Sequence, residues 1–136
     1  MSLTRHEIRE AEFLLLYEKM FNDEPLGELI SVHNENGDVR LDGEIEKTVN
    51  EVLDKLPELD AVISEFSAKR SLERIPKVNL CILRLAVFEI LYRGDVVPRN
   101  AVVNEAVGLA RAYGLEPDVR FVNGFLGAYT RSLESK

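Results

Sequence analysis

Side chains that commonly perform chemistry are few in this sequence, and they stand far apart. There are two histidines, His6 and His33, and one cysteine, Cys81. A di-iron site in a helical bundle needs Glu-x-x-His on two helices, and that repeat does not occur. Zinc-protease, Walker A and dinucleotide-binding motifs do not occur either. Cys81 lies in an apolar run without a nearby base, which favours an inert core thiol. The sequence therefore predicts no enzyme, no metal and no cofactor.

Charge is unevenly distributed along the chain. The formal net charge of −7 argues at first against nucleic acid as a partner. Residues 1–66 carry 6 Lys/Arg and 17 Asp/Glu, whereas residues 67–136 carry 11 and 7. The second half is thus cationic within an acidic protein. This pattern fits either a local anion-binding face or charges that are simply solvated.

Length and composition predict a single globular domain. The chain has 136 residues, of which 46% are hydrophobic and 30% are charged. It contains no run of about 18 apolar residues, which a membrane-spanning helix would need. Its N-terminus also lacks the pattern of a signal peptide. From the sequence we expect a soluble, cytoplasmic protein.

Residues 120–129, RFVNGFLGAY, decide the fold class. An Asn-Gly pair between apolar residues usually indicates a hairpin turn. Here, however, Phe121, Phe125 and Tyr129 recur every four residues, which is the spacing of a helix. Glycines on the other face permit close approach, either by a neighbouring helix or by a ligand. At about 100° per residue, that other face comprises Arg120, Asn123, Gly124, Gly127 and Arg131.

Helical periodicity extends over the rest of the chain. No segment shows the alternation of a strand, so the predicted fold is all-α, with about seven helices. A basic segment at residues 67–77, broken by Pro76, indicates a joint between two sub-bundles at roughly residues 4–66 and 71–134. Thr4 and Glu7 fit a capping box before the first helix. Asp42 and Asp118 are the expected caps of the third and the last helix.

Four segments of the second half have a characteristic order and spacing. They are ILRLAVFEI at 82–90, DVVP at 95–98, NEAVGLA at 104–110 and FVNG at 121–124. In this order they resemble the NusB family of bacterial transcription antitermination factors, which are all-helical. Residues 9–11 and 16–17, REA and LY, match the first helix of that family. The resemblance covers essentially the whole chain and is strongest from 72 to 129.

The resemblance implies a function in transcription. It implies binding of single-stranded boxA RNA in the leaders of ribosomal RNA. It also implies a heterodimer with NusE, a small-subunit ribosomal protein, within the antitermination complex of RNA polymerase. By family position, Tyr17 and Asn79 are then partner-binding residues, although Tyr17 is equally well explained as a core residue.

The N-terminus of the first helix and the last helix are candidate RNA-binding surfaces. At the start of the first helix, Arg5 and Arg9 share a face, with His6 between them, and the helix dipole favours an anion there. Ordinary solvation of a helix start is the alternative. In the last helix, Arg120 and Asn123 supply hydrogen-bond donors for phosphate and base edges.

Two further residues complete the predicted RNA-binding set. Phe121 would stack on an unpaired base if its ring reaches the surface, and otherwise it is a core phenylalanine. Arg84 is polar within an apolar run, so it either extends to the surface or meets a partner.

Two other functions stay open. One is a NusB-like module of the kind fused to an rRNA cytosine methyltransferase, although the chain contains no cofactor-binding βαβ pattern of its own. The other is a helical scaffold that does not bind RNA. This alternative stays open because NusB proteins usually begin with a run of arginines and lysines, and such residues are sparse at the start of this chain.

Overall fold

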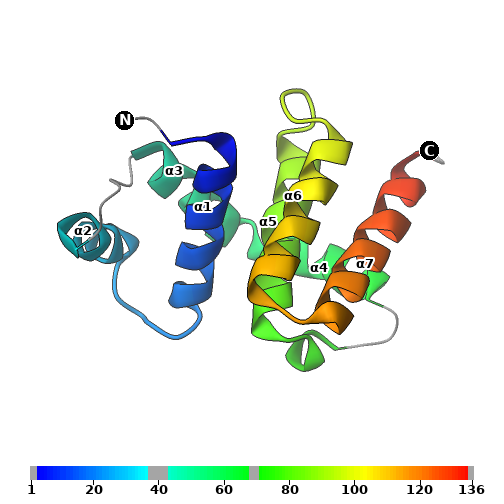
Figure 1. The fold of residues 1–136 in the computed structure, drawn as a ribbon, viewed down its shortest axis with the longest axis horizontal. Helices are drawn as coiled ribbons and strands as arrows, with labels where there is room; N and C mark the ends of the chain where they lie inside the picture. The colour runs from blue at the N-terminus through cyan, green and yellow to red at the C-terminus, as the bar shows by residue number, and fades with distance from the viewer. Residues whose placement is uncertain (1–2, 37–42, 68–70, 135–136) are drawn as a thin grey trace. The chain divides into compact units, whose positions relative to one another are not determined.

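The computed structural model describes residues 3–36, 43–67 and 71–134. Within these residues it contains α-helices, one 3-10 turn and no strand, which confirms the all-α prediction (Figure 1). Asp42, the expected cap of the third helix, lies outside the described residues. The seven helices described are α1 (Arg5–Lys19), α2 (Leu26–Asn36), α3 (Gly43–Asp54), α4 (Leu56–Phe66), α5 (Lys77–Tyr92), α6 (Arg99–Tyr113) and α7 (Glu116–Glu134), with the turn η1 (Leu72–Arg74) before α5.

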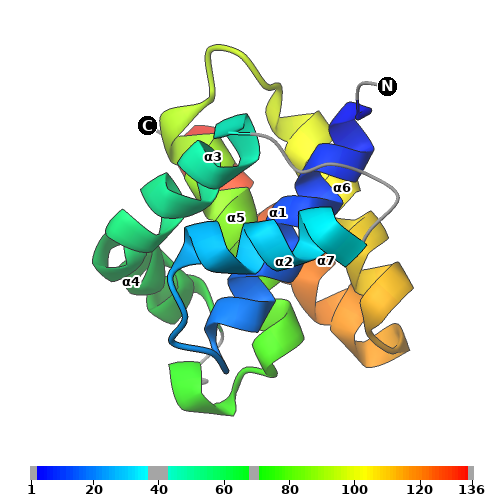
Figure 2. The ribbon, with the colours of Figure 1, turned by 90° about the vertical axis from the view of Figure 1, so that its left-hand side faces the viewer.

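Two compact units make up the chain, Met1–Asp54 and Lys55–Lys136. In the first unit, α1 packs on α2 and α3, and α2 packs on α3. Figure 2 shows α2 crossing the more upright α1. The predicted capping box starts α1, because the Thr4 hydroxyl accepts a hydrogen bond from the Glu7 amide at 3.1 Å.

The second unit is built around α5, which packs on α4, α6 and α7. Almost every α5 residue from Asn79 to Ile90 is buried, which explains why its sequence is apolar nearly all round. Helices α6 and α7 lie side by side and run in opposite directions (Figure 1). The sequence placed residues 56–66 in the first sub-bundle, but α4 packs on α5 and α7. Its Phe66 ring lies 5.4 Å from the ring of Tyr129.

Membrane-spanning segments were not expected from the sequence. Among the described helices, none is both long enough and apolar enough to cross a membrane.

Candidate nucleic-acid interface

Helix α7 begins at a tight turn that is held by hydrogen bonds. The Asp118 carboxylate accepts from the Leu115 amide at 2.7 Å and from the Asn79 side-chain amide at 3.0 Å. The second bond ties the start of α7 to α5. The expectation that Asp118 precedes the helix is wrong, since α7 starts at Glu116 and Asp118 reaches back from the first turn. Pro117 suits that turn because amides there have no helical acceptor.

Gly114 is required in this turn by close packing. A Cβ atom at Gly114 would lie 2.8 Å from Asp118 Oδ2 and 3.0 Å from the Ala110 carbonyl oxygen. Real Cβ atoms essentially never approach another atom closer than 3.0 Å, so a side chain at Gly114 would displace Asp118. The turn therefore fixes where α7 starts and which way its first residues face.

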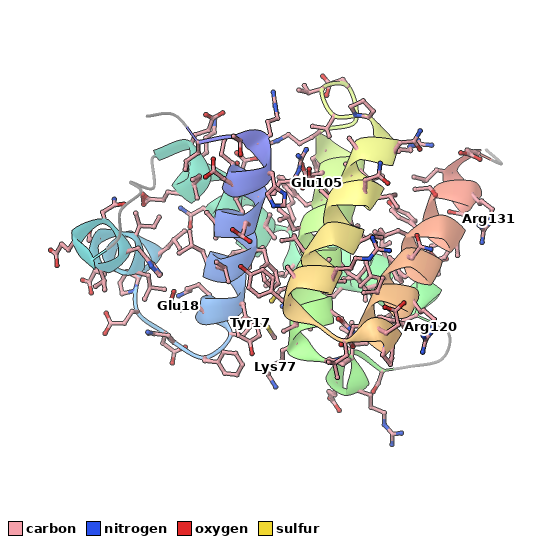
Figure 3. The ribbon with its side chains drawn as sticks, viewed as in Figure 1. Tyr17, Glu18, Lys77, Glu105, Arg120 and Arg131 are labelled. Atoms are coloured by element: carbon pink, nitrogen blue, oxygen red, sulfur yellow. The ribbon has the colours of Figure 1, made fainter. Side chains whose placement is uncertain are left out.

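The two faces of α7 divide as its sequence predicts. Arg120 and Asn123 are exposed, and Figure 3 shows Arg120 and Arg131 pointing away from α6. Phe121 is half-buried at the border between the faces, so its ring is neither fully enclosed nor fully open. The buried face comprises Val119, Val122, Phe125, Leu126 and Tyr129.

The glycines of α7 differ from Gly114 in their surroundings. A Cβ atom at Gly124 would meet no atom within 4 Å in the part of the chain that the structure describes. The explanation that Gly124 admits a neighbouring helix therefore does not hold among these residues. At Gly127, a Cβ atom would lie 3.3 Å from Nη1 of Arg131, so that guanidinium lies over the glycine.

The start of α1 is a weaker anion site than the sequence suggests. Arg5 and His6 are exposed, but only 8% of Arg9 is, so Arg5 and Arg9 do not form one open face. The Glu7 carboxylate already accepts from the Thr4 amide at 2.9 Å. This hydrogen bond is the main reason why the pKa of Glu7 lies below its usual value. An incoming phosphate would compete with a carboxylate that the helix itself supplies.

Arg84 is held inside the second unit. Its Nε and Nη2 atoms each donate to one carboxylate oxygen of Asp60 on α4, both at 2.9 Å. This two-point ion pair is mostly shielded from solvent, and it links α5 to α4. The pair gives Arg84 a structural role, and its contact with RNA stays a prediction.

The two predicted partner-binding residues have opposite surroundings. Asn79 is 1% exposed, and its Oδ1 atom has no hydrogen-bond partner among the described residues. It faces Asp118 rather than solvent. Tyr17 is partly exposed, and its ring lies 5.0 Å from the ring of Phe21, which is 61% exposed. Tyr17 near the end of α1 and Phe21 just after it thus form a partly exposed aromatic pair, of which the sequence predicted only Tyr17.

Known proteins resemble this chain along nearly its full length. The NusB family matches residues 6–131. The transcription antitermination protein NusB of Clostridium acetobutylicum is 35% identical over 136 residues, which are 98% of this chain and 100% of that protein. The NusB of Agathobacter rectalis is 37% identical over 131 residues, which are 93% and 99% of the two chains.

Solved structures resemble it as well. The structure of T. maritima NusB has 30% sequence identity and a TM-score of 0.78, covering 94% of this chain and 91% of that one. A chain from the crystal structure of antitermination factors NusB and NusE in complex with dsRNA has 27% identity and a TM-score of 0.79. That match covers 96% of this chain and 99% of the other.

Proposed function

Since this chain belongs to the NusB family of transcription antitermination proteins, we propose that it binds RNA through the exposed face of α7, with NusE as its protein partner. The expectation of an antitermination protein with the NusB fold, rather than an enzyme, is confirmed by the family and by the named relatives. The RNA is single-stranded boxA-type RNA from ribosomal RNA leaders. The protein acts in the cytoplasm, with the antitermination complex of RNA polymerase.

The exposed face of α7 is the observation that carries this proposal. Arg120 and Asn123 are exposed hydrogen-bond donors in the N-terminal half of α7, and Phe121, which is half-buried, lies between them in the sequence. Arginine pairs with phosphate, asparagine pairs with base edges, and an aromatic ring stacks on an unpaired base. The similar chain solved with NusE and dsRNA supports RNA as the ligand class.

Only a few phosphates can be neutralised by such a small face. The protein carries a net charge of −7, and the sequence-predicted site at the start of α1 is partly filled by Glu7. Arg5 and His6 are therefore secondary contacts. We expect NusE to raise the RNA affinity, because two sites on one RNA gain from the effective concentration of the second.

The aromatic pair Tyr17 and Phe21 is the proposed contact with NusE. Exposed aromatic side chains are enriched at the centres of protein interfaces. Asn79 is buried, so its role in this proposal is to hold Asp118 and the start of α7. A module related to an rRNA methyltransferase is not favoured, since the named relatives are antitermination proteins.

Salt-dependent RNA binding tests the proposal. With single-stranded boxA-type RNA and NusE, we expect a slope of log affinity against log salt of roughly −2 to −4, at about −0.7 per phosphate. Arg120→Ala should weaken binding and reduce the size of the slope by up to about 0.7. Its free energy of unfolding should stay within about 0.5 kcal/mol of wild type, as for other surface changes.

A second variant controls for net charge. Lys47→Ala also removes one positive charge, from an exposed position on α3, and it should leave RNA affinity and slope unchanged. If Arg120→Ala binds RNA as tightly as wild type with NusE present, the assignment to α7 is wrong. If wild type does not bind RNA even with NusE, the scaffold without RNA binding is the better description.

A further inference from the structure

Four residues of α7 share one stripe of the helix surface. Arg120, Gly124, Gly127 and Arg131 follow each other at intervals of four, three and four residues. This spacing puts them on the same side of a helix. At about 1.5 Å per residue, the stripe extends over about 16 Å. We call these four residues the α7 stripe: two arginines with two glycines between them.

Gly124 has no reason within the described protein to lack a side chain. It lies in the interior of a helix, where glycine is among the least favourable residues. It is exposed, and a Cβ atom there would meet nothing within 4 Å among the described residues. Gly114, in contrast, is enforced by packing. Because the packing of the described residues does not require a glycine at position 124, we infer that a bound molecule approaches the backbone closely there.

Gly127 serves a different purpose, which is to make room for Arg131. The Nη1 atom of Arg131 would be 3.3 Å from a Cβ atom at Gly127, so the arginine lies back along the helix over this glycine. It thereby moves its charge toward Arg120 by about 6 Å, the rise of four residues. The Arg131 guanidinium therefore lies on the Gly124 side of its own backbone position, and Arg120 precedes Gly124 by one helical turn.

Acidic residues limit the stripe at both ends. Glu116 precedes Arg120 by four residues, and Glu134 follows Arg131 by three, and both are exposed. Positions four or three apart are neighbours on a helix surface. A polyanion that lay beyond the stripe would meet these carboxylates, so the positive segment suits a short stretch of phosphates.

We propose that the α7 stripe is a track for the RNA backbone, with its closest approach at Gly124 and with Arg131 as a second phosphate-binding arginine beside Arg120. This inference rests on the proposed function and extends it. Arg120 alone would give a point contact. The track instead orders several nucleotides along α7, so that a base next to them can reach Phe121 and Asn123.

Substitution of Gly124 separates this role from any effect on folding. Gly124→Ala should raise the melting temperature by about 2–5 °C, because alanine is the better helix former and has room here. It should nevertheless weaken RNA binding at least fivefold, because the added methyl group holds the backbone away. Gly108→Ala is the matched control, since Gly108 is also a helical glycine with open space around its Cβ position. It should stabilise the protein similarly and leave the RNA affinity unchanged.

Affinity is measured by fluorescence anisotropy with labelled boxA-type RNA in the presence of NusE. Arg131→Ala should reduce the salt slope by up to about 0.7, as Arg120→Ala does. If Arg120→Ala weakens binding but Gly124→Ala and Arg131→Ala bind like wild type, the track is wrong and the proposed function stands. If Arg120→Ala also binds like wild type, the α7 face itself is wrong.

Discussion

Gly114→Ala tests whether packing at the turn between α6 and α7 determines where the proposed RNA-binding helix starts. The new methyl carbon would lie 2.8 Å from Asp118 Oδ2, 2.9 Å from Asp118 Cβ and 3.0 Å from the Ala110 carbonyl oxygen. The φ angle of Gly114 is −121°, which any residue adopts, so the backbone itself opposes nothing. The expected destabilisation therefore comes from crowding around the new methyl group and not from backbone strain.

The size of the destabilisation by Gly114→Ala follows from the displacement of the Asp118 side chain. Overpacking by a methyl group typically costs about 1–3 kcal/mol. Displacement of the Asp118 carboxylate would also weaken its bonds to Leu115 and Asn79, each worth about 1 kcal/mol. With each of these bonds weakened by about half, we expect Gly114→Ala to lower the free energy of unfolding by about 2–4 kcal/mol. Urea titration followed by circular dichroism at 222 nm measures this value, and the m-value should not change.

A double-mutant cycle locates the cause. Asp118→Ala removes the nearest oxygen but keeps the Cβ, so in that background Gly114→Ala should be less damaging by at least about 0.5 kcal/mol. Gly124→Ala adds the same methyl group at a position with open space, and it should stabilise the protein. If Gly114→Ala lies within about 0.5 kcal/mol of wild type, or if the two changes are additive, the packing argument for the turn is refuted.

Three further expectations concern the second unit. Phe125→Ala should lower the free energy of unfolding by about 3–5 kcal/mol in a urea titration, because its 3%-exposed ring packs in the core. Burial raises the pKa of the Cys81 thiol from 9.0 to about 12 and raises that of Tyr129, so these groups lose protons more easily when unfolded. The protonated groups therefore stabilise the folded state fully below about pH 9, and this contribution is lost as the pH rises toward 12, so the melting temperature should fall over that range. Cys81 should react with a thiol reagent at pH 8 only on unfolding. Arg84→Ala should destabilise the protein by about 1–2 kcal/mol, because it leaves the half-buried Asp60 unpaired, and a stability unchanged on urea titration would contradict this.

Local patterns allowed the fold and the faces of α7 to be predicted. The recurrence of Phe121, Phe125 and Tyr129 every four residues indicates a helix without any information on tertiary contacts, because sequence spacing alone determines which residues are neighbours on a helix. The same rule gave Arg120 and Asn123 as exposed. These predictions succeeded because they depend on residues within one helix.

Pairings between helices could not be predicted. Arg84 and Asp60 are 24 residues apart, and Asn79 and Asp118 are 39 apart, with no pattern that links them. The break at Pro76 is visible in the sequence, whereas the packing of α4 on α5 and α7 is not, so α4 was placed in the wrong group. Burial of Arg9 likewise depends on neighbours that its own helix does not reveal.

The structural role of a glycine is likewise hard to predict from the sequence. The sequence does not show how much space surrounds Gly114 or Gly124. The structure separates them, because one is surrounded by atoms within 3.0 Å and the other has none within 4 Å among the described residues. Space around a residue is a property of the packed fold, which a single sequence does not express.

Joint binding of boxA-type RNA by this protein and NusE can be measured in one titration. Labelled boxA-type RNA and a scrambled RNA of equal length are titrated with the protein, each with and without NusE, at the same salt concentration. We expect weak binding by the protein alone, and a clearly tighter complex with NusE that prefers the boxA sequence. Equal affinity for both RNAs in the presence of NusE, or an affinity for boxA that NusE leaves unchanged, would show that the protein and NusE do not recognise boxA RNA jointly.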